Sequence, residues 1–300
     1  MSFRKPNFTN ELKKFLNSNL NFKILFNSNS RGLILPLTNN LCILDSSFNP
    51  PHKGHFSLVK QCILHNFNRD HNQQNISTIN NKSVLLLLSV NNADKKSQPA
   101  RFEDRLEMMY ILAYKISNEL GVSVSIGITT FAMFTDKSKE INNYINNLKI
   151  NENGNVTYSN NIKLIFLMGY DTLIRVLNPK YYLPNSLKDS LSDFMENCDL
   201  FTLTRSSSSE FESPSHENNQ EINSQFQYLQ DIKENKIEGI PKEWGPKIHL
   251  VNGDLNSISI SSSEIRKKAS VNNNESAKFL EDVTFKEISD YIRTNNLYKL

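Results

Sequence analysis

The chain has 300 residues and a formal net charge of +3, with 34 basic side chains against 31 acidic ones. So small an excess does not predict a general nucleic-acid binder, although an anionic small substrate needs only local positive charge. The longest apolar run, residues 84–88, is far too short to span a bilayer, and the N-terminus lacks the apolar segment of a signal peptide. We therefore expect neither a nucleic-acid partner nor a membrane partner.

The three cysteines are far apart in the sequence and form no C-x-x-C pair, so we expect no zinc site and no disulfide framework. Cys42 and Cys62 lie in apolar runs and are expected in the core, as suits a reducing compartment. The sequence shows no clear basic run for nuclear import. The cytoplasm is therefore the expected location, and the nucleus stays open.

Residues 1–37 form an N-terminal flank that precedes the main pattern of the chain. Apolar side chains at helical spacing predict an amphipathic helix there that packs on a sheet. These side chains are Leu12, Phe15, Leu16 and Leu20.

From residue 38 onward, apolar runs of strand length alternate with segments of helical spacing. In 102–115, for example, Phe102, Leu106, Met109 and Ala113 form one stripe. Apolar strands that alternate with helices are typical of a parallel sheet covered on both faces. We therefore predict an α/β domain over residues 38–300. Its strands are expected at residues 41–45, 84–90, 122–128, 162–168, 199–204 and 247–252.

Three polar segments of this domain lack periodicity and predict surface insertions. They are rich in Asn or Ser and lie near residues 66–82, 150–160 and 206–224. Three histidines in or beside them are expected to be exposed to solvent and without a role. These are His65, His71 and His216.

The most informative motif is S-S-F-N-P-P-H-K-G-H at residues 46–55, between the first apolar strand and a helical pattern. A strand that turns into a helix offers a phosphate free backbone N–H groups and the positive end of a helix dipole. Charged imidazoles at His52 and His55 would meet phosphate oxygens there, and Gly54 would let a ligand approach the backbone. The alternative is a pair of surface histidines in a proline-rich turn.

A second candidate phosphate site is I-S-S-S-E-I-R at residues 260–266. A helix is expected to begin near Ser262 or Ser263, since serine is a good N-cap. The two hydroxyls, the helix-start amides and the guanidinium of Arg266 would then converge on a phosphate. Taken alone, the segment is better explained as a capped helix with a basic exposed face.

Three further candidates follow predicted strands. In M-G-Y-D, Gly169 would allow a nucleotide to approach, and Asp171 would accept hydrogen bonds from ribose hydroxyls or act as a helix N-cap. Lys95 in N-N-A-D-K-K and Arg205 in T-L-T-R would reach phosphates or be solvated loop residues.

In this order, the elements resemble those of the nicotinamide-nucleotide adenylyltransferases, a family within the H-x-G-H nucleotidyltransferase superfamily. The resemblance runs from about residue 41 to the C-terminus and is interrupted by the polar insertions. More narrowly, the chain resembles a fungal branch of the family. It implies a Rossmann-like fold with helices on both faces of the sheet. It also implies transfer of the adenylyl group of ATP to nicotinamide mononucleotide, which gives NAD and pyrophosphate.

The resemblance implies roles for single residues as well. The ATP site would comprise Ser46, Ser47, Phe48, His52, His55, Gly169, Asp171, Ser262, Ser263 and Arg266. Of these, the catalytic candidates are His52, His55 and Arg266. The acceptor site would comprise Lys95, Arg205, Tyr181 and Tyr182.

Two departures from the family pattern concern these roles. The family usually has glycine where this chain has Ser46, and a side chain there hinders close approach of phosphates to the backbone. The family often has a tryptophan after G-x-D that stacks on the nicotinamide ring, but Trp244 of this chain lies elsewhere. Tyr181 and Tyr182 lie at about the right distance to supply an aromatic face instead.

The expected reaction is direct in-line attack of the acceptor phosphate on the α-phosphorus, without a covalent intermediate. Mg²⁺ would be held mainly by ATP phosphates and water, with no protein metal site. Other readings stay open: a cytidylyl or pantetheine-phosphate transferase, an ATP hydrolase without an acceptor, or a nucleotide-binding regulatory protein. Preference between the nicotinamide and nicotinic-acid nucleotides is open too.

Overall fold

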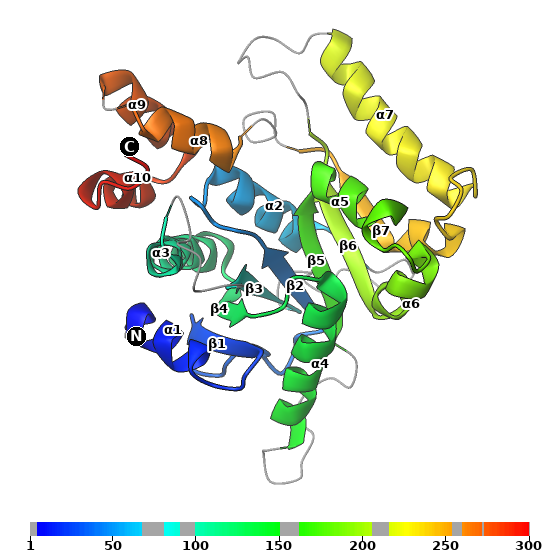
Figure 1. Cartoon of the computed structure of the whole chain (residues 1–300), viewed down its shortest axis with the longest axis horizontal. Helices are drawn as coiled ribbons and strands as arrows, with labels where there is room; N and C mark the ends of the chain where they lie inside the picture. The colour runs from blue at the N-terminus through cyan, green and yellow to red at the C-terminus, as the bar shows by residue number, and fades with distance from the viewer. Residues whose placement is uncertain are drawn as a thin grey trace.

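The computed structural model describes residues 5–67, 81–90, 100–150, 162–205, 216–253, 260–271 and 273–299. Within them a seven-stranded sheet has the order β1-β4-β3-β2-β5-β6-β7 (Figure 1). Its strands are β1 Phe22–Asn27, β2 Asn40–Asp45, β3 Lys82–Ser89, β4 Ser123–Thr129, β5 Lys163–Gly169, β6 Cys198–Leu203 and β7 Ile248–Val251. All pairs from β2 to β7 are parallel, whereas β1 is antiparallel to β4. The predicted α/β sheet is confirmed, with one antiparallel edge strand added.

The strand order fixes where a ligand site belongs. Counted from β2, the parallel strands follow the doubly wound order 3-2-1-4-5-6 of the Rossmann fold. The order reverses between β2 and β5, because the chain leaves β2 toward β3 and β4 and later returns to β5 on the other side. In such sheets ligands bind at the carboxyl ends of the strands at this switch point.

Helices cover both faces of the sheet. One face carries α1 Phe8–Leu16, α2 Lys53–Leu64, α3 Phe102–Leu120, α8 Ser262–Ala269, α9 Asn274–Val283 and α10 Lys286–Thr294. The other carries α4 Phe134–Ile150, α5 Tyr170–Val176, α6 Leu187–Asn197 and α7 His216–Lys233, with the 3₁₀ turns Pro179–Tyr181 and Lys242–Lys247.

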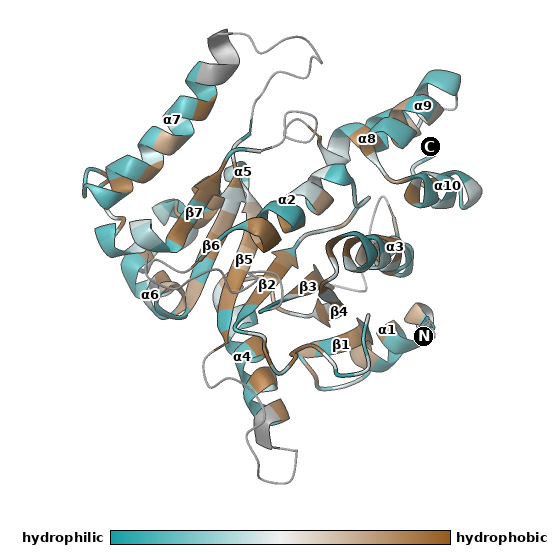
Figure 2. Cartoon of the chain, turned by 180° about the vertical axis from the view of Figure 1, so that it is seen from behind, coloured by the Kyte–Doolittle hydropathy of each residue, from teal (hydrophilic) through white to brown (hydrophobic). Residues whose placement is uncertain are grey.

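The central strands are largely apolar because both of their faces are buried. Along β2, for example, Cys42 and Leu44 join one core cluster, and Leu41 and Ile43 join the other. Figure 2 shows the consequence: the strands are mostly hydrophobic, and the helices are polar on their outer sides. This period of two, without a polar face, is what a doubly covered parallel sheet requires.

The N-terminal flank belongs to the fold more fully than predicted. Its helix α1 buries Phe8, Leu12 and Phe15 in the cluster that also holds α3, whereas Leu16 and Leu20 are exposed. The flank also supplies β1, which the sequence reasoning missed.

The predicted insertions are only partly described. Residues 68–80, 151–161 and 206–215 lie outside the described parts of the chain, and so does His71. The loop predicted over 206–224 is wrong from residue 216 onward, because α7 begins there. No helix of the described segments is long and apolar enough to cross a membrane.

Candidate active site at the switch point

A cavity of about 200 Å³ opens at the carboxyl ends of β2, β5 and β6, where the topology places a ligand site. Its walls come from the end of β2, the first turn of α2, the β5–α5 junction and the end of β6. The polar side chains that line it are Asp45, Ser46, His52, His55, Tyr170, Thr172, Thr204 and Arg205.

The two histidines of the motif cap the helix that they begin. The Nδ1 atom of His52 accepts the backbone N–H of Gly54 at 3.1 Å, and the Nδ1 atom of His55 accepts the backbone N–H of His52 at 3.1 Å. This is a capping box built from imidazoles in place of the usual serine and glutamate. The Gly54 amide, expected to be free for a phosphate, is therefore already bonded.

Both imidazoles are neutral in this arrangement. Burial, and then the repulsion that a protonated His52 would meet from a protonated His55 and from Arg205, holds the pKa of His52 well below its usual range. Burial lowers the pKa of His55 to about 4. Because each Nδ1 atom accepts a backbone N–H, the ring proton must lie on Nε2. The expectation of charged imidazoles is therefore wrong for the unliganded chain, which presents neutral N–H donors instead.

The turn between β2 and α2 is held from the C-terminal part of the chain. Arg266 Nη1 donates to the carbonyl of Asn49 at 2.9 Å, and Ser262 Oγ donates to the carbonyl of Pro50 at 3.1 Å. The hydroxyl of Tyr298 donates to Asn49 Oδ1 at 3.0 Å. Phe48 adopts a φ of 46° and is fully buried. Its contribution to the site is therefore the shape of the turn.

In the predicted second phosphate site, Ile260 lines the cavity, whereas Ser262, Ser263 and Arg266 border the turn and do not line it. Ser263 Oγ accepts from Arg266 Nη2 at 3.0 Å, so the serines and the arginine of α8 are brought together as expected. No carboxylate among the described residues pairs with the Arg266 guanidinium. Ser47 is exposed and likewise does not line the cavity.

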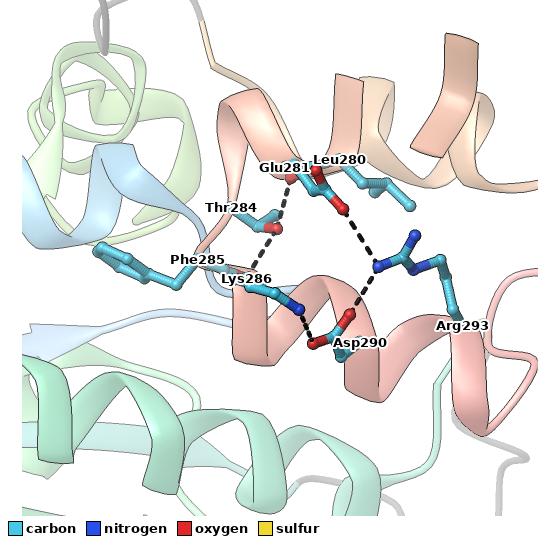
Figure 3. A network of polar contacts seen from close by, with 7 residues as sticks. All are labelled: Leu280, Glu281, Thr284, Phe285, Lys286, Asp290 and Arg293. Atoms are coloured by element: carbon cyan, nitrogen blue, oxygen red, sulfur yellow. Dashed lines mark hydrogen bonds and ion pairs between the residues drawn. The ribbon is translucent and has the colours of Figure 1, made fainter. Parts of the chain in front are cut away.

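A polar network fixes the C-terminal helices next to the first turn of α2. Lys53 Nζ donates to the carbonyls of Glu281 and Asp282 at the end of α9. In Figure 3 Arg293 bridges Glu281 and Asp290, and Asp290 also pairs with Lys286. These contacts close the α9–α10 corner. The lysine beside His52 therefore points to this corner and away from the cavity.

Arg205 and Asp171, predicted for different substrates, form an ion pair with each other at the cavity. The backbone of Arg205 is held by Gln225 of α7, whose Oε1 accepts the Arg205 N–H at 3.0 Å and whose Nε2 donates to the Arg205 carbonyl. Gln225 is buried. No motif indicated this residue beforehand, because it lies just after the predicted polar insertion.

Of the acceptor candidates among the described residues, Arg205 lines the cavity and the two tyrosines do not. Tyr181 is exposed, and Tyr182 is half-buried with its hydroxyl donating to the carbonyl of Val176 at 2.8 Å. Lys95 lies outside the described residues. The aromatic ring that does line the cavity is Tyr170, next to Gly169, and burial raises its pKa to about 12.

The carboxylates at the cavity are engaged by cations. Asp45 pairs with Lys137 of α4 in a buried ion pair, and desolvation still raises the pKa of Asp45. Among the described residues, no group of three or more His, Cys, Asp and Glu side chains is arranged to hold a metal ion.

No protein-family model matches the chain. A curated relative from Schizosaccharomyces pombe, named "Putative nicotinamide mononucleotide adenylyltransferase", is 31% identical over 208 residues. The match covers 69% of this chain and 66% of the relative, just under two thirds of its length.

Among solved structures, nicotinic acid mononucleotide adenylyltransferase of Plasmodium falciparum resembles the chain at 18% identity, both complexed with NaAD and complexed with APC. The TM-scores are 0.47 and 0.49, over 87% of this chain and 97% of those chains. By its match to the fission yeast relative, and with its histidine motif at the switch point of a doubly wound sheet, the chain is similar to the nicotinamide-nucleotide adenylyltransferases.

Proposed function

We propose that this chain transfers the adenylyl group of ATP to nicotinamide mononucleotide and releases pyrophosphate. The observation that carries the proposal is the pair of neutral imidazoles at the start of α2, inside a cavity at the switch point. A helix start with N–H donors favours phosphate oxygens, and the switch point favours a nucleotide. The name of the fission yeast relative supports the same reaction.

In the proposed reaction the acceptor phosphate attacks the α-phosphorus in line, and the α–β bridging oxygen leaves with pyrophosphate. The acceptor phosphate is already an anion at neutral pH, so it needs no base. The role of the protein is then to position both nucleotides and to stabilise the charge that moves to the leaving group. The donor groups for this are His52 Nε2–H, the start of α8 and the guanidinium of Arg266.

Ser46 and His55 have the spacing of a nucleophile and its base, but their hydrogen bonding excludes that role. A base would need a free lone pair on His55 Nε2, 3.0 Å from Ser46 Oγ. That atom carries the ring proton, because Nδ1 accepts the His52 amide. A covalent serine intermediate is therefore not part of the proposal.

The metal and the acceptor complete the proposed site. Mg²⁺ would neutralise charge on the β- and γ-phosphates, held by phosphate and water oxygens. The ion pair of Arg205 with Asp171 would open toward the acceptor, with the guanidinium meeting its phosphate and the carboxylate a ribose hydroxyl. Tyr170 offers the aromatic face expected earlier from Tyr181 or Tyr182.

The test is to mix purified protein with ATP, Mg²⁺ and nicotinamide mononucleotide, and to follow NAD and pyrophosphate together. We expect the two products in equal amounts, and a loss of roughly 100-fold in rate with His52→Ala. His65→Ala, at the other end of the same helix, is the matched control and should keep the rate.

Other outcomes separate the alternatives. Phosphate release from ATP without NAD would indicate a hydrolase, and turnover with CTP would indicate a cytidylyl transferase. Nucleotide binding without any turnover would indicate a regulatory protein. Parallel assays with nicotinic acid mononucleotide would set the acceptor preference.

A further inference from the structure

Ser46 lies next to the imidazole of His55 at the cavity. Its hydroxyl oxygen lies 3.0 Å from His55 Nε2, and its backbone N–H donates to the carbonyl of Leu87 at 3.3 Å. Both Ser46 and His55 line the cavity. The serine replaces the glycine that is usual in the family, so this contact is a property of this chain.

The direction of the hydrogen bond follows from the other side of the ring. The backbone N–H of His52 can only donate, so His55 Nδ1 accepts and is unprotonated. The ring is neutral, because burial lowers its pKa to about 4. Its proton therefore lies on Nε2 and is donated to Ser46 Oγ.

This leaves the hydroxyl proton of Ser46 without an assigned acceptor. The Ser46 oxygen accepts from His55, and no described residue accepts its proton. The same holds for Nε2–H of His52, whose Nδ1 is bonded to Gly54. Two donors, one imidazole and one hydroxyl, are therefore available at the cavity.

We propose that Ser46 delivers the hydrogen bond of His55 to a phosphate oxygen of the bound nucleoside triphosphate. The chain of donors is the His52 amide, the His55 ring and the Ser46 hydroxyl, and each donor polarises the next. His52 meets the phosphates directly, and His55 acts as a positioning residue. This inference rests on the proposed function, because it needs a nucleotide in this cavity.

The experiment is a double-mutant cycle of Ser46→Ala and His55→Ala, with kcat and KM for ATP measured for each protein. If the two residues act as one unit, each single variant and the double variant should lose activity alike, roughly 10- to 100-fold. Ser46→Thr keeps the hydroxyl and should recover most of the rate. Ser192→Ala on α6, far from the cavity, is the control for serine loss.

For the same set of variants we would also measure the affinity for a non-hydrolysable ATP analogue and the melting temperature. If the wild-type chain makes no NAD, the proposed function fails, but non-additive losses of affinity would still support the relay. Wild-type values for Ser46→Ala beside a large loss for His55→Ala would overturn it. So would losses that simply add in the double variant.

Discussion

A pair of histidines lies at each end of helix α2, with His249 of β7 completing the second pair, and the two pairs differ in where their donated hydrogen bonds end. At the amino edge of the sheet, His249 Nε2 lies 2.9 Å from Asp199 Oδ2, and His65 Nε2 lies 3.3 Å from His249 Nδ1. That chain ends on a carboxylate, which Lys163 also contacts at 3.0 Å. At the carboxyl edge, the chain through His55 ends on the Ser46 hydroxyl, which faces the cavity.

The expectation that His65 would be exposed and without partners is therefore wrong. It is half-buried, and burial, with the charges of His249 and Lys82, lowers its pKa to about 4. A pair of histidines therefore indicates a ligand site when its ring N–H groups have no acceptor in the protein. At the amino edge the histidines bond to each other and to Asp199, and so stabilise the fold.

The largest expected difference between the two histidine pairs is in how stability depends on pH. A histidine whose pKa is about 4 in the folded chain and 6.5 in the unfolded one contributes stability above pH 6.5, which is lost as the pH falls toward 4. For His55 the loss in the free energy of unfolding reaches about 3 kcal/mol by pH 4, since each pKa unit is worth about 1.4 kcal/mol.

We expect denaturant titrations between pH 7 and 4 to show a shallower pH slope for His55→Gln than for the wild type. His65→Gln should change the slope less, because His65 is the more exposed of the two. Parallel slopes for the wild type and His55→Gln would contradict a neutral, buried His55.

Removing the carboxylate at the amino edge should come next in size. Asp199 is buried, and the Asp199→Ala change leaves His249 without its acceptor. We expect a loss of about 2 kcal/mol, less than for a fully buried pair because Lys163 can reach water. ATP affinity should stay unchanged. Asp193→Ala on the exposed side of α6 is the matched control. A loss of ATP affinity with Asp199→Ala would contradict a purely structural role for the histidines at the amino edge.

At the carboxyl edge, Gln225→Ala should act through Arg205. Without the amide that holds its backbone, Arg205 is less well placed for an anionic acceptor. We expect the KM for nicotinamide mononucleotide to rise about tenfold, with the KM for ATP little changed. Gln227→Ala is the control, since Gln227 bonds Asp231 within its own helix. Equal acceptor KM values for the two variants would rule out this positioning role.

The smallest expected effect concerns the other end of α2. The buried Lys82 donates to the carbonyls of Cys62, Ile63 and His65, the last of the helix. Lys82→Met should cost about 1 kcal/mol in the free energy of unfolding, because these carbonyls lose their donors while a buried charge is removed. Thermal melts beside Lys60→Met, an exposed position on the same helix, would measure it. A stabilised Lys82→Met variant would mean that the desolvation penalty of the buried charge exceeds the stabilisation from its three hydrogen bonds.

The sequence predicted the parallel strands well because each is a short apolar run between polar ends. The six predicted runs match β2 to β7 within a few residues at each end. Strand β1 was missed because it is antiparallel and lies in the flank, outside the alternating pattern. Helix α7 was missed because its first half continues a polar insertion whose composition resembles a loop.

The sequence predicted which segments come together at the site, but not how their side chains pair or where their protons lie. The turn at residues 46–55 and the start of α8 do meet, as expected. The pairing of Arg205 with Asp171 depends on two strand ends that only the folded sheet brings together. The protonation of His52 and His55 depends on burial and on backbone donors, neither of which a motif displays.

The hydrogen bond from Tyr298 to Asn49 joins residues 249 positions apart. During synthesis at roughly 5–20 residues per second, the turn therefore leaves the ribosome some tens of seconds before the tyrosine that completes its support. A nascent chain holds the histidines, the serine and most of the sheet well before it holds the clamp on the turn. The cavity at the switch point should consequently reach its final shape late in translation, after the sheet around it.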